Sequence, residues 1–179
     1  MGQNGRTSYI SGLVFIILFT TIIYFVFFFT KGMFGEKIPN LDGPYEVIRV
    51  IDGDTIAVEI QGKERNIRLI GVDSPESVAD ENYKENTVEG KEASLYTRDM
   101  LEGQKVYLEY DKEHYDSYGR KLCYVYLGDK TMFNELLVKE GYARVMTVEP
   151  NHMHENRFIA AEEKAKKEGK GFWGTGFFK

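Results

Sequence analysis

Residues 45–72 read YEVIRVIDGDTIAVEIQGKERNIRLIGV, and this stretch decides the fold. β-Branched and apolar residues alternate with polar ones in three runs, residues 45–51, 55–60 and 63–72. An alternation with a period of two predicts half-buried strands. The Asp52-Gly53 and Gln61-Gly62 pairs between the runs are typical of tight turns, so we predict a meander of three strands.

The remainder of the chain predicts two further strands and about three helices. The strand-like runs are residues 104–110 and 121–127, and the helix-like runs are residues 85–102, 131–140 and 154–168. Gly103 and Gly141 follow two of these helices, where glycine commonly ends a helix. Five short strands with one helix after the third predict an α+β fold, a five-stranded Greek-key barrel of the oligonucleotide/oligosaccharide-binding (OB) type.

The first residues predict a membrane anchor ahead of the barrel. No charged side chain occurs between Arg6 and Lys31, and residues 9–30 are almost continuously apolar. About 20 such residues in a helix cross the roughly 30 Å hydrocarbon core of a bilayer. A cleaved signal peptide is the competing interpretation, but the run is long for one and lacks a small-x-small cleavage pattern. The predicted order is a tail (1–8), a transmembrane helix (9–30), a linker (31–44), the folded domain (45–174) and a C-terminal tail (175–179).

The folded part of the chain is acidic and nearly free of cysteine. Residues 38–179 contain 20 Lys and Arg against 27 Asp and Glu. This excess of negative charge argues against tight non-specific binding of duplex nucleic acid, but it is compatible with a catalyst that needs only a local basic cleft. The single Cys123 excludes an internal disulfide and, in its apolar run, is predicted to be a core residue.

Carboxylates and arginines occur in a pattern that suits cleavage of a phosphodiester. The carboxylates are Asp54, Asp73 and Glu76, and the arginines are Arg68 and Arg120. Hydrolysis requires a hard cation held by oxygen ligands, a carboxylate that positions or deprotonates water, and planar cations that neutralise the phosphate. Each residue alone has an ordinary structural explanation, such as a turn or a surface cation. Clustered carboxylates without a cation would repel one another, so the whole set favours a nuclease.

With these motifs placed, the chain resembles the thermonuclease family of staphylococcal-nuclease-like, calcium-dependent nucleases. The resemblance covers about residues 45–173. It rests on five blocks that occur in order along the chain. The first three are residues 51–55 (IDGDT), 68–76 (RLIGVDSPE) and 116–120 (DSYGR). The fourth combines Asn134-Glu135, Leu137 and residues 141–143 (GYA), and the fifth combines residues 162–167 with Trp173.

The resemblance implies a metal site and a base. Asp54 and Asp73 are expected to bind Ca²⁺ through their carboxylates, joined by the backbone carbonyl of Ser74. Glu76 is expected to hold or deprotonate the attacking water. His154 is expected to pair with Glu92 in a structural tie between helices.

The resemblance also implies how substrate is held. Arg68 and Arg120 are expected to bind the phosphate, and Tyr118 to flank the bound nucleotide. The implied products are 3′-phosphate and 5′-hydroxyl ends, from single- or double-stranded DNA or from RNA. The chain departs from the family's pattern at Met146 and Val148, where tyrosines are common, which predicts weaker stacking on the base.

Two further expectations concern partners and location. A compartment with millimolar calcium suits an open calcium site, so we expect the nuclease domain outside the cell, attached to the cell membrane by its single span. No protein partner is inferred. The alternative function is a non-catalytic OB-type module, tethered to the membrane, that binds nucleic acid or protein; such modules usually lack the site carboxylates or arginines.

Overall fold

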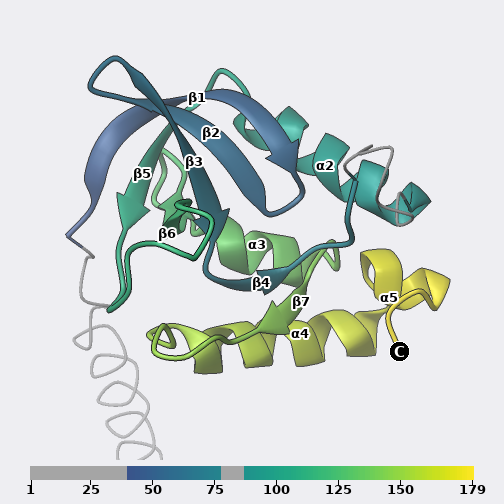
Figure 1. Cartoon of the computed structure of the whole chain (residues 1–179). Coiled ribbons are helices and arrows are strands. Elements are labelled where there is room, and N and C mark those ends of the chain that lie inside the picture. Colours follow the sequence, from purple (N-terminus) through teal and green to yellow (C-terminus); the bar gives the residue numbers. More distant parts are fainter. Residues whose placement is uncertain (1–39, 78–86) are drawn as a thin grey trace, which may run out of the picture. The chain divides into compact units, whose positions relative to one another are not determined.

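The computed structural model describes residues 40–77 and 87–179 (Figure 1). The strands are β1 (Asp42–Asp52), β2 (Thr55–Ile60), β3 (Lys63–Leu69), β4 (Gly71–Asp73), β5 (Lys105–Glu109), β6 (Lys121–Tyr126) and β7 (Arg144–Met146). The helices are α2 (Val88–Leu101), α3 (Phe133–Lys139), α4 (Glu155–Glu168) and α5 (Gly171–Thr175).

Five strands close into a barrel in the order β1-β2-β3-β6-β5. All the pairings are antiparallel except that of β3 with β6, which is parallel. This order confirms the predicted five-stranded barrel of the OB type. Register shifts in β1, one of them between Val50 and Asp52, bend this strand as it approaches the β1–β2 turn.

The predicted third strand, residues 63–72, is in fact two strands. β3 ends at Leu69, and β4 leaves the barrel to pair with β7. Gly71, the first residue of β4, has φ +79°, and a Cβ there would lie 2.5 Å from the Phe158 ring on α4. Only glycine tolerates both this conformation and this contact, so the chain turns sharply at this point.

The core fills the barrel and continues beneath it. Fully buried side chains from β2, β3 and β6, such as Ile56, Ile67 and Val125, pack against Phe133 and Leu137 of α3. In Figure 1, α3 lies below the barrel strands, α4 runs alongside β7, and α2 stands beside the β1–β2 turn. Cys123 is buried in this core as predicted, and burial raises the pKa of its thiol to about 12.

The ends of the folded region differ from the predicted ones. β1 begins at Asp42, within the stretch predicted as a linker, because residues of this segment pair with β5. Phe178, in the predicted C-terminal tail, is only 6% exposed and packs against Phe172 of the unpredicted helix α5.

The predicted transmembrane helix, residues 9–30, lies outside the described residues. Within residues 40–77 and 87–179, every helix is too short or too polar to cross a membrane.

Candidate active site

The β1–β2 turn places Asp54 in the interior. Asp54 is 5% exposed, and its two carboxylate oxygens accept hydrogen bonds from the Thr55 hydroxyl (3.0 Å) and the Ser74 N–H (2.9 Å). Burial raises the pKa of Asp54, while the nearby Arg68 guanidinium opposes the rise. The carboxylate is therefore held in one orientation. Its charged form has lost most of its hydration, and a nearby positive charge would stabilise that form.

Gly53 lets the turn approach its neighbours closely. A Cβ at this position would lie 2.6 Å from the Ser74 hydroxyl and 3.0 Å from the Ala93 side chain of α2. The Gly53 carbonyl also accepts a 2.7 Å hydrogen bond from the Thr97 hydroxyl. The turn, the segment after β4 and helix α2 are thus packed against one another at Asp54.

Arg68 lies opposite Thr55 in the β2–β3 register and points toward Asp54. One of its terminal nitrogens donates to the carbonyls of Leu69 (3.0 Å) and Val72 (2.8 Å). The other lies 3.1 Å from Asp54 and 3.8 Å from Asp73. The guanidinium is therefore anchored by backbone and links the two predicted metal-binding carboxylates.

Asp73 is positioned by the small β4–β7 sheet. It pairs directly with Arg144 in the register, and the Arg144 guanidinium lies 3.1 Å from its carboxylate. Ser74 follows, with a buried hydroxyl that has no hydrogen-bond partner in the described structure. An orphaned buried oxygen next to two carboxylates is an unusual feature, since buried polar atoms are nearly always satisfied.

Glu76 and Asp52 form the acidic side of the site. Asp52 is 5% exposed and accepts hydrogen bonds from the Gly53 N–H and from the N–H and hydroxyl of Ser77. A hydrogen bond to Asp52, followed by burial and the negative charges of Asp52 and Asp54, raises the pKa of Glu76 to about 7. Helix α2 holds the Glu76 backbone, because a Cβ on Gly90 would overlap the Glu76 carbonyl.

Arg120 is held by a local clip in the loop before β6. Asp116 accepts from the Arg120 N–H (2.9 Å), from its Nε (2.6 Å) and from the Tyr118 N–H (3.0 Å). Burial alone would raise the pKa of Asp116, but these hydrogen bonds outweigh burial and lower it. Within residues 40–77 and 87–179, the clip uses only the N–H and Nε of Arg120, so its two terminal guanidinium nitrogens remain for a ligand.

The structure brings Arg68 and Arg120 together on one cleft of about 580 Å³. Met146 and Val148, where the family pattern has tyrosines, line the same cleft and are exposed. Tyr118 does not line it; its ring is 85% exposed and lies 5.4 Å from the Arg120 guanidinium. The cleft thus has two guanidiniums and an apolar wall, with the acidic cluster behind Arg68.

The donor set suits a hard cation that keeps much of its water. Within residues 40–77 and 87–179, no three His, Cys, Asp or Glu side chains form a metal-binding group. Asp54, Asp73 and Ser74 offer only oxygen atoms, and Ca²⁺ and Mg²⁺ both accept a few protein oxygens completed by water. The buried Asp54 carboxylate and the unpartnered Ser74 hydroxyl are compatible with such an ion.

The predicted pairing of His154 with Glu92 is wrong. The His154 ring lies 2.8 Å from the carboxylate of Glu109 on β5, which also accepts a 2.6 Å hydrogen bond from the Tyr126 hydroxyl. Glu92 instead lies exposed on α2. His154 remains a structural residue, because it joins α4 to the barrel away from the cleft.

Sequence reasoning missed three residues that shape the site, Asp52, Arg144 and Asp116. Asp52 looked like part of a tight turn, although its place two residues before Asp54 was a usable signal. Asp116 was also visible, four residues before Arg120. The role of Arg144 depends on a strand register across 71 positions of sequence, which no local pattern reveals.

Residues 66–175 match the family described as staphylococcal nuclease homologue. The chain is 45% identical over 169 residues to the thermonuclease of Staphylococcus hyicus, covering 91% of this chain and 96% of that protein. It is 40% identical over 167 residues to the thermonuclease of Staphylococcus intermedius, with the same coverage. It is also 39% identical over 127 residues to the endonuclease YncB of Bacillus subtilis (strain 168), covering 70% of this chain and 59% of that protein.

Proposed function

The chain belongs to the staphylococcal nuclease homologue family and is a nuclease, and from this premise we propose that it hydrolyses DNA or RNA in the cleft that Arg68 and Arg120 share. The observation that carries the proposal is the meeting of these two arginines, from β3 and from the loop before β6, at one cleft beside the buried carboxylates of Asp52 and Asp54. Planar guanidiniums bind phosphate oxygens through paired hydrogen bonds.

The two arginines have different parts in this proposal. Arg68 is fixed by the Leu69 and Val72 carbonyls, so it presents its charge at a set position next to the carboxylates. Arg120 uses Nε for Asp116 and keeps its terminal nitrogens for the phosphate. Fixed cations of this kind stabilise negative charge that develops on the phosphate oxygens during cleavage.

Glu76 is proposed as the group that positions the attacking water and accepts its proton. Its carboxylate lies among Asp52, Asp54 and Arg68, all of which influence it electrostatically. It follows the predicted ligand Ser74 by two residues, on a segment that packing against Gly90 holds in place. The products proposed from the family resemblance are 3′-phosphate and 5′-hydroxyl ends.

Calcium is the proposed cofactor, held by Asp54, Asp73 and the Ser74 carbonyl with waters. The support is the oxygen-only donor set and the burial of Asp54, whose negative charge is paired with the Arg68 guanidinium. A divalent cation bound there would supply positive charge to the phosphate and to a nearby water.

Degradation of single-stranded DNA by the full chain tests these roles. We expect cleavage with millimolar Ca²⁺ and none with chelator, with Mg²⁺ compared in parallel. Glu76→Gln should lower the rate by about 100- to 10,000-fold, because it removes the proton acceptor. The matched control is Glu163→Gln, at an exposed position on α4.

Two outcomes would change the proposal. An unchanged rate in Glu76→Gln would remove Glu76 from the chemistry. A folded chain that binds DNA but cleaves none of it under any metal condition would favour the alternative, a tethered binding module.

The membrane anchor and the location outside the cell are separate proposals, supported by the apolar run of residues 9–30. Mass spectrometry of the chain recovered from washed membranes tests them, together with protease treatment of intact cells. An N-terminus near Gly32 would show that the segment is a cleaved signal peptide, and protection from protease would place the domain inside.

A further inference from the structure

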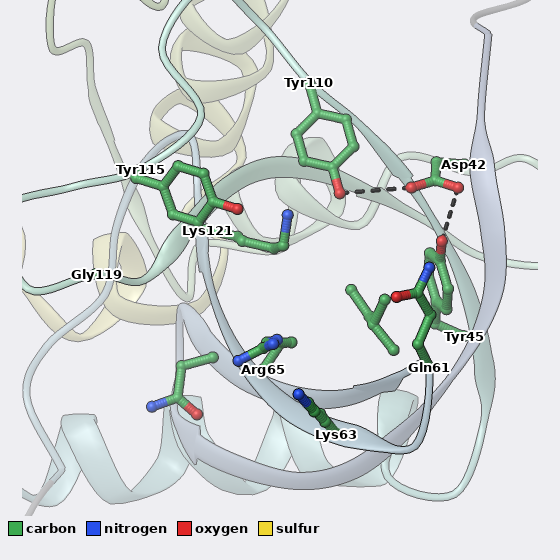
Figure 2. A pocket seen from close by; sticks show the side chains of 11 residues that line it. Asp42, Tyr45, Gln61, Lys63, Arg65, Tyr110, Tyr115, Gly119 and Lys121 are labelled. Carbon is green, nitrogen blue, oxygen red and sulfur yellow. Dashed lines mark hydrogen bonds between the residues drawn. The ribbon is translucent and has the colours of Figure 1, made fainter.

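A second hollow opens at the far end of the barrel strands. Its volume is about 630 Å³, and Figure 2 shows the 11 residues that line it. Three of them are cationic and three are tyrosines, and these are Lys63, Arg65, Lys121, Tyr45, Tyr110 and Tyr115. Lys63 and Arg65 come from β3, as Arg68 does, and Lys121 begins β6.

The three cations of this hollow have no carboxylate ion-paired to them in the part of the chain that the structure describes. Among the described residues, Lys63, Arg65 and Lys121 form no ion pair. Asp42 is the one carboxylate in the lining, and it accepts hydrogen bonds from the hydroxyls of Tyr45 (2.7 Å) and Tyr110 (3.5 Å), as Figure 2 shows. The hollow is therefore a local basic surface in a folded domain that has more acidic than basic residues.

Aromatic rings lie beside these cations. The ammonium of Lys121 lies 5.1 Å from the centre of the Tyr110 ring and 4.9 Å from that of Tyr115. Tyr115 is 53% exposed, so one side of its ring is open to a ligand. A cationic groove with accessible aromatic rings is how OB folds bind a single nucleic-acid strand, with the cations on the backbone and the rings on the bases.

The hollow adjoins the cleft at the candidate active site. Tyr115 lines both, and Gly119 of the hollow directly precedes Arg120 of the cleft. Along β3, Arg65 and Arg68 are three residues and about 10 Å apart, and their side chains leave the strand on opposite faces, so a bound strand has to turn at Tyr115, which lines both places. A strand whose phosphate lies between Arg68 and Arg120 can therefore pass Tyr115 and reach Arg65 within a few nucleotides.

We propose that this hollow is an additional subsite for the single-stranded DNA or RNA substrate, in which Lys63 and Arg65 bind phosphates beyond the scissile one and Tyr115 stacks on a base. The proposal rests on the nuclease function of the neighbouring cleft. It makes the enzyme favour longer strands over dinucleotides, because only longer strands reach both places.

The test compares binding and cleavage in the full chain carrying Lys63→Gln and Arg65→Gln together. Binding of a 12-nucleotide oligothymidylate is measured by fluorescence anisotropy in chelator, so that no cleavage occurs, over a series of salt concentrations. Loss of two phosphate contacts should weaken binding about tenfold and reduce the slope of log affinity against log salt by about 1.4. With calcium present, KM for the 12-mer should rise by about the same factor as its binding weakens, whereas the rate of dinucleotide hydrolysis should not change.

The matched control is Lys139→Gln with Lys167→Gln. Both are exposed, neither forms an ion pair among the described residues, and the same two charges are lost. Equal weakening in the control would mean that only net charge matters, which overturns the subsite. Unchanged 12-mer binding in the hollow variant overturns it too, as does equal displacement of the oligonucleotide by polyglutamate of the same charge. Dinucleotide hydrolysis reports on the proposed active site separately, so its loss would not be mistaken for failure of the subsite.

Discussion

At one end of β3, Arg68 donates to two backbone carbonyls and faces two carboxylates, whereas at the other end Lys63 and Arg65 have no ionic partner among the described residues. The first arrangement keeps each charge in one position, with Asp54 and Asp52 each holding several hydrogen bonds. The second leaves the cations solvated and free to meet a ligand. Charges tied by the fold suit chemistry that needs fixed geometry, while unpaired charges suit binding of a flexible strand.

The largest expected effect comes from removing the guanidinium of Arg68, at the end of β3 that lies in the candidate active site. Arg68→Ala leaves the buried Asp54 carboxylate without its cation, which should destabilise the fold by about 3–5 kcal/mol, because the penalty of an unpaired buried charge remains. Arg49→Ala is the control, because it removes an arginine from the exposed pair with Glu64 and should change stability by about 0–1 kcal/mol. Urea unfolding measures both, and equal losses would show that Asp54 is not held by Arg68.

A smaller effect should follow from adding a methyl group at Gly53, which packs closely beside the carboxylates of the candidate active site. Gly53→Ala forces a methyl group within 2.6 Å of the Ser74 hydroxyl, so we expect a loss of about 1–3 kcal/mol together with a fall in cleavage. Gly128→Ala is the control, since a Cβ there would meet no atom within 4 Å and stability should shift by no more than about 0.5 kcal/mol. Thermal unfolding of the two variants checks this, and equal stability would contradict the close packing at Gly53.

The smallest effect concerns the clip between the two regions, Asp116 with Arg120. The folded-state pKa of Asp116 lies below its ordinary value of 3.8, so the clip contributes stability above that value and loses it as pH falls through the lowered pKa. Asp116→Asn should therefore be slightly less stable than the natural chain at neutral pH, and the difference should be smaller at about pH 3, below the ordinary pKa of 3.8. Urea midpoints at both pH values measure it; a difference of the same size in acid would mean that the carboxylate charge is not what holds Arg120.

Much of the fold could be predicted because its signals are local. The alternation in residues 55–60 and 121–127 and the helix-like run of residues 154–168 depend only on near neighbours, and these elements lie where they were expected. The break of the predicted strand at Ile70-Gly71 could not be predicted, because it depends on the Phe158 ring of α4, which lies far along the chain. Phe178 likewise becomes a core residue only because the chain after α5 turns back and places this ring against Phe172.

By itself, the sequence determined the residue types of the site, the order in which they occur and the barrel that carries them, since turn chemistry and hydrophobic period are encoded within a few residues. Only the tertiary structure decided which charges meet. The register of β4 with β7 joins Asp73 to Arg144, and the β3–β6 pairing brings Arg68 to the cleft of Arg120. The same closure of the barrel gathers Lys63, Arg65 and Lys121 into one hollow. Electrostatic interactions act over a few ångströms of space and are indifferent to distance along the chain, so they become defined only when the strands pair.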